Sequence, residues 1–96
     1  MKYLVIDASL SGTGIRDKYN GGYLSPEYLG LSCTTMDKLN QWLTKYENEH
    51  YNGFTDDSLI DELDREGKEI AYMIKSEMPE VKVEYFSDAR MTNEII

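Results

Sequence analysis

Two segments near opposite ends of the chain have the residue pattern of β-strands. Tyr3 to Leu10 (YLVIDASL) is apolar on both alternating faces at its start, which predicts a strand in the middle of a sheet. In EVKVEYF, apolar residues at positions 81, 83 and 85 alternate with Lys82, Glu84 and Phe86, which predicts a second strand. The tail SDARMTNEII is polar until its last two isoleucines, and no regular element is predicted there.

The first of two predicted helices follows a glycine-rich region. Thr34 or Thr35 is expected to cap it, and it runs to about Glu49 before Asn52-Gly53 ends it. Apolar residues at spacings of three and four form its buried stripe, namely Met36, Leu39, Leu43, Tyr46 and His50.

The second predicted helix carries most of the acidic residues. Thr55 is expected to cap it, with Asp56 and Asp57 in its first turn, where the helix dipole favours negative charge. The helix runs to Met78, because Pro79 disfavours helical geometry at the residue before it. Gly67 lies inside it and predicts either a close backbone approach or a break, since glycine is unfavourable within a helix.

This order of elements predicts an α/β chain of the α+β type. The first and last strands become parallel neighbours joined by a right-handed crossover through the two helices. Because two strands make a thin sheet, a third is expected within Gly21 to Ser32. We therefore expect a single domain over residues 1–96, with a small sheet of two or three strands packed by two main helices.

Charge narrows the classes of partner. The chain has 18 acidic and 10 basic residues, a formal net charge of −8, which disfavours non-specific attraction to nucleic acid or anionic membranes and favours a basic partner. Nine acids lie between Glu47 and Glu69 against Arg65 and Lys68, a local excess of seven. No apolar run approaches the roughly 20 residues of a membrane helix, so a cytoplasmic location is expected.

The loop SGTGIRDKYNGG after the first strand raises the possibility of a phosphate site. A small nucleotide- or phosphate-binding enzyme would use Asp7 at the strand end and the loop residues Gly12, Thr13 and Gly14. The loop contains neither GxxxxGK[ST] nor GxGxxG. We therefore favour a structural loop whose glycines adopt positive φ.

No other constellation predicts catalysis. His50 is the only histidine and lies at the end of the first helix, where no nucleophile is identified by spacing. Cys33 is the only cysteine, so it has no internal disulfide partner, and we expect it to be buried or half-buried. The chain is expected to be a non-enzyme without metal or cofactor.

The acidic helix instead predicts a protein-binding surface. Asp57, Asp61 and Asp64 share one helix face at spacings of four and three, on the side away from the apolar stripe. A solvated face and a divalent-metal site are the alternatives, although no calcium loop of the EF-hand type is present. Tyrosine is enriched at interfaces. The predicted partner-binding residues are Asp57, Asp61, Asp64, Glu47, Glu49, Tyr19, Tyr23 and Tyr51.

Several short blocks carry a resemblance across most of the chain: LSGTGIRD, GGYLSPEYLGLS, QWLTKYENEHY, ELDREGKEIA and EMPEVKVEYFSDA. Together they resemble small acidic bacterial immunity proteins of polymorphic-toxin and contact-dependent inhibition systems. The resemblance implies a stoichiometric cytoplasmic inhibitor that covers the active site of a toxin domain, often a nuclease, and it assigns no individual residue. The alternative is a phage-type acidic mimic of nucleic acid that inhibits a host defence enzyme.

Overall fold

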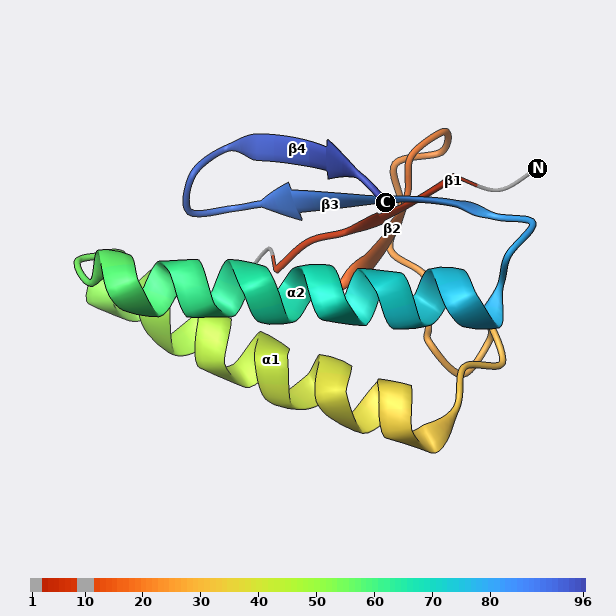
Figure 1. Cartoon of the computed structure of the whole chain (residues 1–96), viewed down its shortest axis with the longest axis horizontal. Helices are drawn as coiled ribbons and strands as arrows, with labels where there is room; N and C mark the ends of the chain where they lie inside the picture. The colour runs from red at the N-terminus through yellow and green to blue at the C-terminus, as the bar shows by residue number, and fades with distance from the viewer. Residues whose placement is uncertain (1–2, 9–11) are drawn as a thin grey trace.

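The computed structural model describes residues 3–8 and 12–96 and has an α+β fold (Figure 1). Four strands and two long helices follow one another in the order β1, β2, α1, α2, β3, β4. Their bounds are β1 Tyr3–Ile6, β2 Ile15–Asp17, α1 Cys33–Asn52, α2 Asp57–Glu77, β3 Lys82–Ser87 and β4 Thr92–Ile95.

The strands form one mixed sheet in the order β2-β1-β3-β4. Its centre is the parallel pair β1 and β3, in which Leu4 lies beside Val83, so the predicted parallel pairing is confirmed. The third strand was expected within residues 21–32, which is wrong. β2 begins directly after Gly14, whose φ is 93°, and it pairs antiparallel with β1. β4, for which no element was predicted, pairs antiparallel with β3, and all four of its residues are exposed.

Both helices begin at a polar cap close to the predicted residue. Ser32 caps α1 and accepts a hydrogen bond from the backbone N–H of Thr35 at 3.2 Å. Asp56, one residue after the expected Thr55, caps α2 and accepts from the N–H of Leu59 at 3.1 Å. α1 ends at Gly53 in the left-handed conformation, as Asn52-Gly53 predicted.

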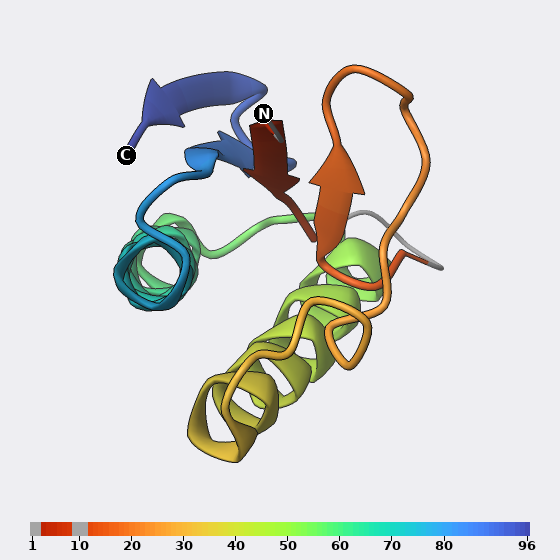
Figure 2. The ribbon, with the colours of Figure 1, turned by 90° about the vertical axis from the view of Figure 1, so that its right-hand side faces the viewer.

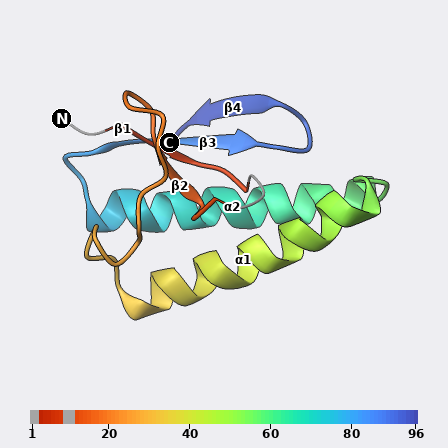
Figure 3. The ribbon, with the colours of Figure 1, turned by 180° about the vertical axis from the view of Figure 1, so that it is seen from behind.

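Both helices cover the same face of the sheet, and in the described residues no helix covers the other face (Figure 2). α1 and α2 lie close together where α1 ends and α2 begins, and they diverge toward the other end (Figure 3). Glu77 connects the diverging ends, because its carboxylate accepts hydrogen bonds from the N–H of Ser32 at 2.7 Å and from the hydroxyl of Thr35.

At Gly67 the backbone of α2 packs directly against two core aromatic rings. The helix runs through it without a break, and a Cβ atom there would lie 2.7 Å from Cζ2 of Trp42 and closer still to the ring of Tyr85. Both aromatic side chains are fully buried. The expectation of a close backbone approach is therefore confirmed, and glycine is retained for space rather than for its φ angle.

Candidate functional site

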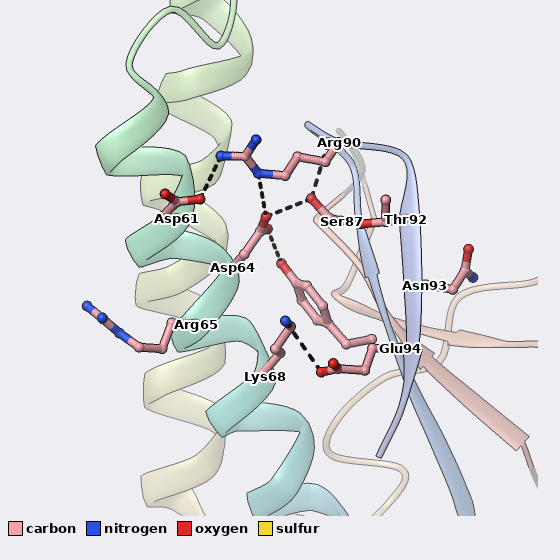
Figure 4. Close-up of a pocket in the computed structure, with 10 residues that line it drawn as sticks. Asp61, Asp64, Arg65, Lys68, Ser87, Arg90, Thr92, Asn93 and Glu94 are labelled. Carbon is pink, nitrogen blue, oxygen red and sulfur yellow. Dashed lines mark hydrogen bonds and ion pairs between the residues drawn. The ribbon is translucent and has the colours of Figure 1, made fainter.

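Asp64 is the centre of a buried hydrogen-bond network between α2 and β3 (Figure 4). Its Oδ1 accepts from the hydroxyls of Tyr85 at 2.6 Å and Tyr46 at 3.0 Å, and its Oδ2 accepts from Ser87 at 2.9 Å. Nε of Arg90 lies 3.6 Å from the same Oδ2. Asp64 is only 8% exposed. It connects α1, α2 and β3, which is a structural role.

The prediction that Asp64 belongs to an exposed acidic face is therefore wrong. Three residues along a helix correspond to a rotation of about 60° from Asp61. That rotation is enough to turn Asp64 toward β3, whereas the side chain of Asp61 remains 72% exposed. Helical spacing alone does not reveal which edge of the acidic face a neighbouring strand will cover.

The two tyrosines of this network are held in their protonated form. Burial raises the pKa of Tyr85 above its ordinary value, and the hydrogen bond to the Asp64 carboxylate raises it further. Burial likewise raises the pKa of Tyr46. Because both hydroxyls must donate to a carboxylate, ionisation of either would break the network.

Arg90 forms an ion pair with α2 from outside the helix, so residue spacing within α2 could not predict it. It lies in the turn between β3 and β4, and Nη2 is 2.6 Å from Oδ1 of Asp61 and 3.5 Å from the backbone oxygen of Asp57. A cleft of about 480 Å³ separates α2 from β3 and β4. It is bordered by Arg90 and by the ion pair of Lys68 with Glu94, at 3.4 Å (Figure 4).

The connection from α1 to α2 and the turn between β3 and β4 lie at the same end of the molecule (Figure 1), and both carry exposed side chains. We call this the tip surface and define it as Tyr51, Asp56, Asp57, Asp61 and Met91. Tyr51 is 75% exposed and Met91 is 73% exposed. No ion pair of the Asp57 carboxylate occurs within residues 3–8 and 12–96.

The other predicted acids lie on different sides of α1. Glu47 is exposed, as expected. Glu49 is only 3% exposed and accepts a hydrogen bond from Asn52 at 3.4 Å, so its predicted place on an exposed surface is wrong. The reason is helical periodicity, because Glu49 follows Tyr46 by three residues and lies on the same buried side.

The loop tyrosines are not brought to the tip surface. Tyr19 is 67% exposed, and its ring packs edge-on against Tyr3, 5.9 Å away, where β1 begins. Tyr23 is 38% exposed and donates its hydroxyl to Oδ1 of Asp7 at 2.9 Å. Asp61 lies instead beside the turn that follows β3. The parallel arrangement of β1 and β3 thus separates Tyr19 from the predicted acidic interface.

Asp7 and Thr13, the polar residues of the candidate phosphate site, are engaged within the protein. Asp7 is 1% exposed and also accepts from Nε of Arg16 at 3.1 Å. The hydroxyl of Thr13 donates to the backbone oxygen of Leu24 at 2.6 Å. A Cβ atom at Gly12 would lie 2.6 Å from the ring of Tyr23. The positive φ predicted for the loop is confirmed at Gly14, while residues 9–11 lie outside the described part of the chain.

Cys33 and His50 are too far apart to act together. Cys33 is exposed in the first turn of α1, so its predicted burial is wrong, because two residues rotate a helix by about 200° and Thr35 is the residue of that turn that is buried. Their separation of 17 positions corresponds to about 26 Å along the helix axis. Nε2 of His50 lies 3.0 Å from the backbone oxygen of Ala8 and 3.6 Å from the Asp88 carboxylate.

A further buried carboxylate, Glu84, lies on the helix-free face of the sheet and is 4% exposed. It accepts hydrogen bonds from the hydroxyl of Tyr3 at 3.0 Å, from Nζ of Lys18 at 2.8 Å and from Nδ2 of Asn93 at 2.7 Å. Burial raises the pKa of Glu84, but these hydrogen bonds outweigh it and hold the pKa below its ordinary value. Sequence reasoning treated this residue only as part of a strand pattern.

Within the described residues, no group of three or more histidine, cysteine, aspartate or glutamate side chains is arranged to hold a metal ion. In that same part of the chain, no helix combines the length and the apolar character that a membrane span requires. The chain matches no protein-family model, and neither curated proteins nor solved structures show a significant similarity to it.

Proposed function

We propose that this chain is a non-catalytic protein inhibitor, an immunity protein that binds a cognate bacterial toxin domain in the cytoplasm and covers its active site. The observation that carries the proposal is the tip surface, which combines exposed carboxylates with two exposed apolar side chains at one end of the molecule. Asp57 and Asp61 supply negative charge, and Tyr51 and Met91 supply contact area.

This combination suits a basic protein partner. Exposed carboxylates accelerate encounter with a positively charged surface, while aromatic and methionine side chains contribute affinity once water is excluded. A nuclease fits well as the toxin, because it binds the phosphate backbone through lysine and arginine. An inhibitor that pairs with those residues excludes the substrate without imitating it.

The alternative readings have less support. A nucleic-acid mimic requires a continuous stripe of carboxylates, whereas the groove between α1 and α2 mixes both signs of charge. Its charged residues are Lys38, Lys45, Glu62, Arg65, Glu66 and Glu69. A phosphate-binding loop requires free polar groups, whereas the hydroxyl of Thr13 and the carboxylate of Asp7 already bond within the protein.

We expect a neighbouring gene to encode the toxin domain, and the test is complex formation between the two proteins. We expect the pair to co-purify in a one-to-one ratio and the toxin to lose its activity in the complex. The double variant Asp57→Lys and Asp61→Lys should slow association at least tenfold at low salt and weaken its salt dependence. Tyr51→Ala should mainly accelerate dissociation.

The matched control is the double variant Glu27→Lys and Glu80→Lys. It changes the net charge by the same amount, but both exposed residues lie at the opposite end of the helices, before α1 and after α2. Association with this control should remain within about threefold of the unmodified protein, since only the long-range field changes. Equal association rates for the two double variants would show that the tip surface is not the interface.

A further inference from the structure

The two edge strands of the sheet differ in whether their outer backbone groups form hydrogen bonds. The outer edge of β2 is closed by the chain itself, because the N–H of Asp17 donates to the oxygen of Gly22 and the N–H of Leu24 donates to the oxygen of Ile15, both at 2.8 Å. β4 forms the other edge and pairs only with β3. No described residue covers its outer side, and all four of its residues are exposed. An uncovered edge is a template for a further strand.

The register identifies the backbone groups available at this edge. The N–H of Ile96 donates to the oxygen of Val83 at 2.9 Å, so residue 96 faces β3 with its backbone groups. Alternate residues of an antiparallel strand face the same side. Glu94 and Thr92 therefore also face β3, whereas Asn93 and Ile95 direct their backbone N–H and C=O groups outward.

We infer that an extended segment of the partner adds to the sheet at β4, with lysine or arginine alternating with apolar residues. This inference rests on the proposed function and specifies how the partner is held. Backbone groups of Asn93 and Ile95 would supply the hydrogen bonds, and the side chains of β4 would select the sequence of the segment.

The side chains of β4 present different chemistry on the two faces of the sheet. Glu94 lies on the helix side, where it contacts Lys68, and its side chain remains 51% exposed. Ile95 lies on the helix-free side, opposite Glu84 in the register, and is 74% exposed. A strand beside β4 therefore meets a carboxylate on one face and an isoleucine on the other. Basic and apolar residues in alternation complement this pattern, because cross-strand neighbours on one face interact.

A second copy of this chain fits the edge poorly. Antiparallel self-pairing through both outward residues, Asn93 and Ile95, places Glu94 directly opposite Glu94 of the second copy. Like charges directly opposite each other destabilise a sheet. The pairing would also join two chains that each carry a net charge of −8. The observations therefore favour a basic segment from another protein.

The experiment uses the full chain and the peptide Lys-Val-Lys-Val-Lys-Val-Lys, acetylated and amidated. Amide chemical shifts and hydrogen exchange are followed by NMR. We expect the peptide to bind and to shift and protect the amides of Asn93 and Ile95. The non-alternating peptide Lys-Lys-Lys-Val-Val-Val-Lys, with the same composition, and the alternating glutamate peptide should bind at least tenfold more weakly.

Two variants test the backbone contribution. Ile95→Pro removes an outward N–H at an edge position that tolerates proline, and it should weaken binding of the alternating lysine peptide at least tenfold. Ile95→Thr retains the N–H and should stay within about threefold of the unmodified protein. If Ile95→Pro does not fold, protection of the Asn93 and Ile95 amides in the unmodified protein decides the matter.

Strand addition is overturned if the alternating lysine peptide does not bind, if the non-alternating peptide binds equally well, or if the shifts map to the groove between α1 and α2. Each of these results would leave complex formation with the toxin domain unaffected. The failure of this inference is thus distinguishable from a failure of the proposed function.

Discussion

Replacing Asp64 with alanine tests whether this carboxylate is structural. The side chain accepts three hydroxyl hydrogen bonds, and among residues 3–8 and 12–96 it is the only hydrogen-bond partner of the Tyr85 hydroxyl. Tyr46 and Ser87 keep other partners, since the N–H of Ala89 donates to the Tyr46 oxygen at 3.2 Å and the two hydroxyls lie 3.4 Å apart.

The expected loss of stability follows from these contacts. An orphaned buried hydroxyl costs about 1–3 kcal/mol. The two weakened bonds and the space left by the carboxylate increase the loss, so Asp64→Ala should lower the free energy of unfolding by about 3–5 kcal/mol. Domains of this size are stable by only about 5–15 kcal/mol, so the change is a large fraction of the total.

Guanidinium unfolding followed by tryptophan fluorescence measures the loss, because Trp42 is the only tryptophan and is fully buried. Asp61→Ala is the matched control, since Asp61 contacts the same Arg90 from an exposed position. Exposed ion pairs contribute about 1 kcal/mol or less, so the control should be nearly neutral. A loss below 1 kcal/mol for Asp64→Ala, or equal losses for the two variants, would refute the reasoning.

Three further predictions concern packing and pH. Gly67→Ala should destabilise the protein by about 1–3 kcal/mol despite the better helix propensity of alanine, whereas Gly22→Ala, with no atom within 4 Å of the added Cβ, should be nearly neutral in the same unfolding assay. Because the pKa of Glu84 is lowered in the folded state, its ionised carboxylate stabilises the fold fully above the ordinary pKa of 4.5. This stabilisation is lost as the pH falls through the folded-state pKa. Glu84→Gln should therefore destabilise the protein at pH 7 and approach the unmodified protein in acid, and stability curves that stay parallel would contradict this. The pKa of Tyr85 is raised above 10.0, so its protonated hydroxyl stabilises the fold fully below that pH. This stabilisation is lost as the pH rises through the folded-state pKa. The variant Tyr85→Phe should lose less stability at alkaline pH than the unmodified protein. Tyrosinate absorbance measures the ionisation and circular dichroism measures the unfolding.

The sequence predicted the partner-binding residues of α2 only in part. Spacing on α2 placed Asp57 and Asp61 on an exposed face, which the structure confirms, but it also placed Asp64 there. The burial of Asp64 depends on how closely the β3–β4 hairpin approaches α2, and that distance is set by side chains far apart in sequence. Arg90 follows Asp61 by 29 residues, so helical spacing could not reveal this ion pair.

The sequence by itself determined the elements whose signals are local. Helical periodicity and caps placed α1 and α2 within a few residues of their ends, and alternation placed β3, because each residue's preference depends on neighbours within one or two turns. Gly53 ended α1 for the same reason, since only a residue free to adopt the left-handed conformation fits there.

Tertiary structure alone decided the remaining features. β4 buries none of its four residues, so it leaves no hydrophobic pattern in the sequence, and only its pairing with β3 makes it a strand. β2 begins directly after Gly14, where an added Cβ atom would lie 2.8 Å from the side chain of Leu39 in α1, so its location depended on packing between segments far apart in sequence. Whether a polar side chain is exposed depends on which element covers it. Asp64 is buried for that reason, because β3 and the turn after it cover one edge of the acidic face of α2. Glu49 differs, because its spacing from Tyr46 already places it on the buried side of α1.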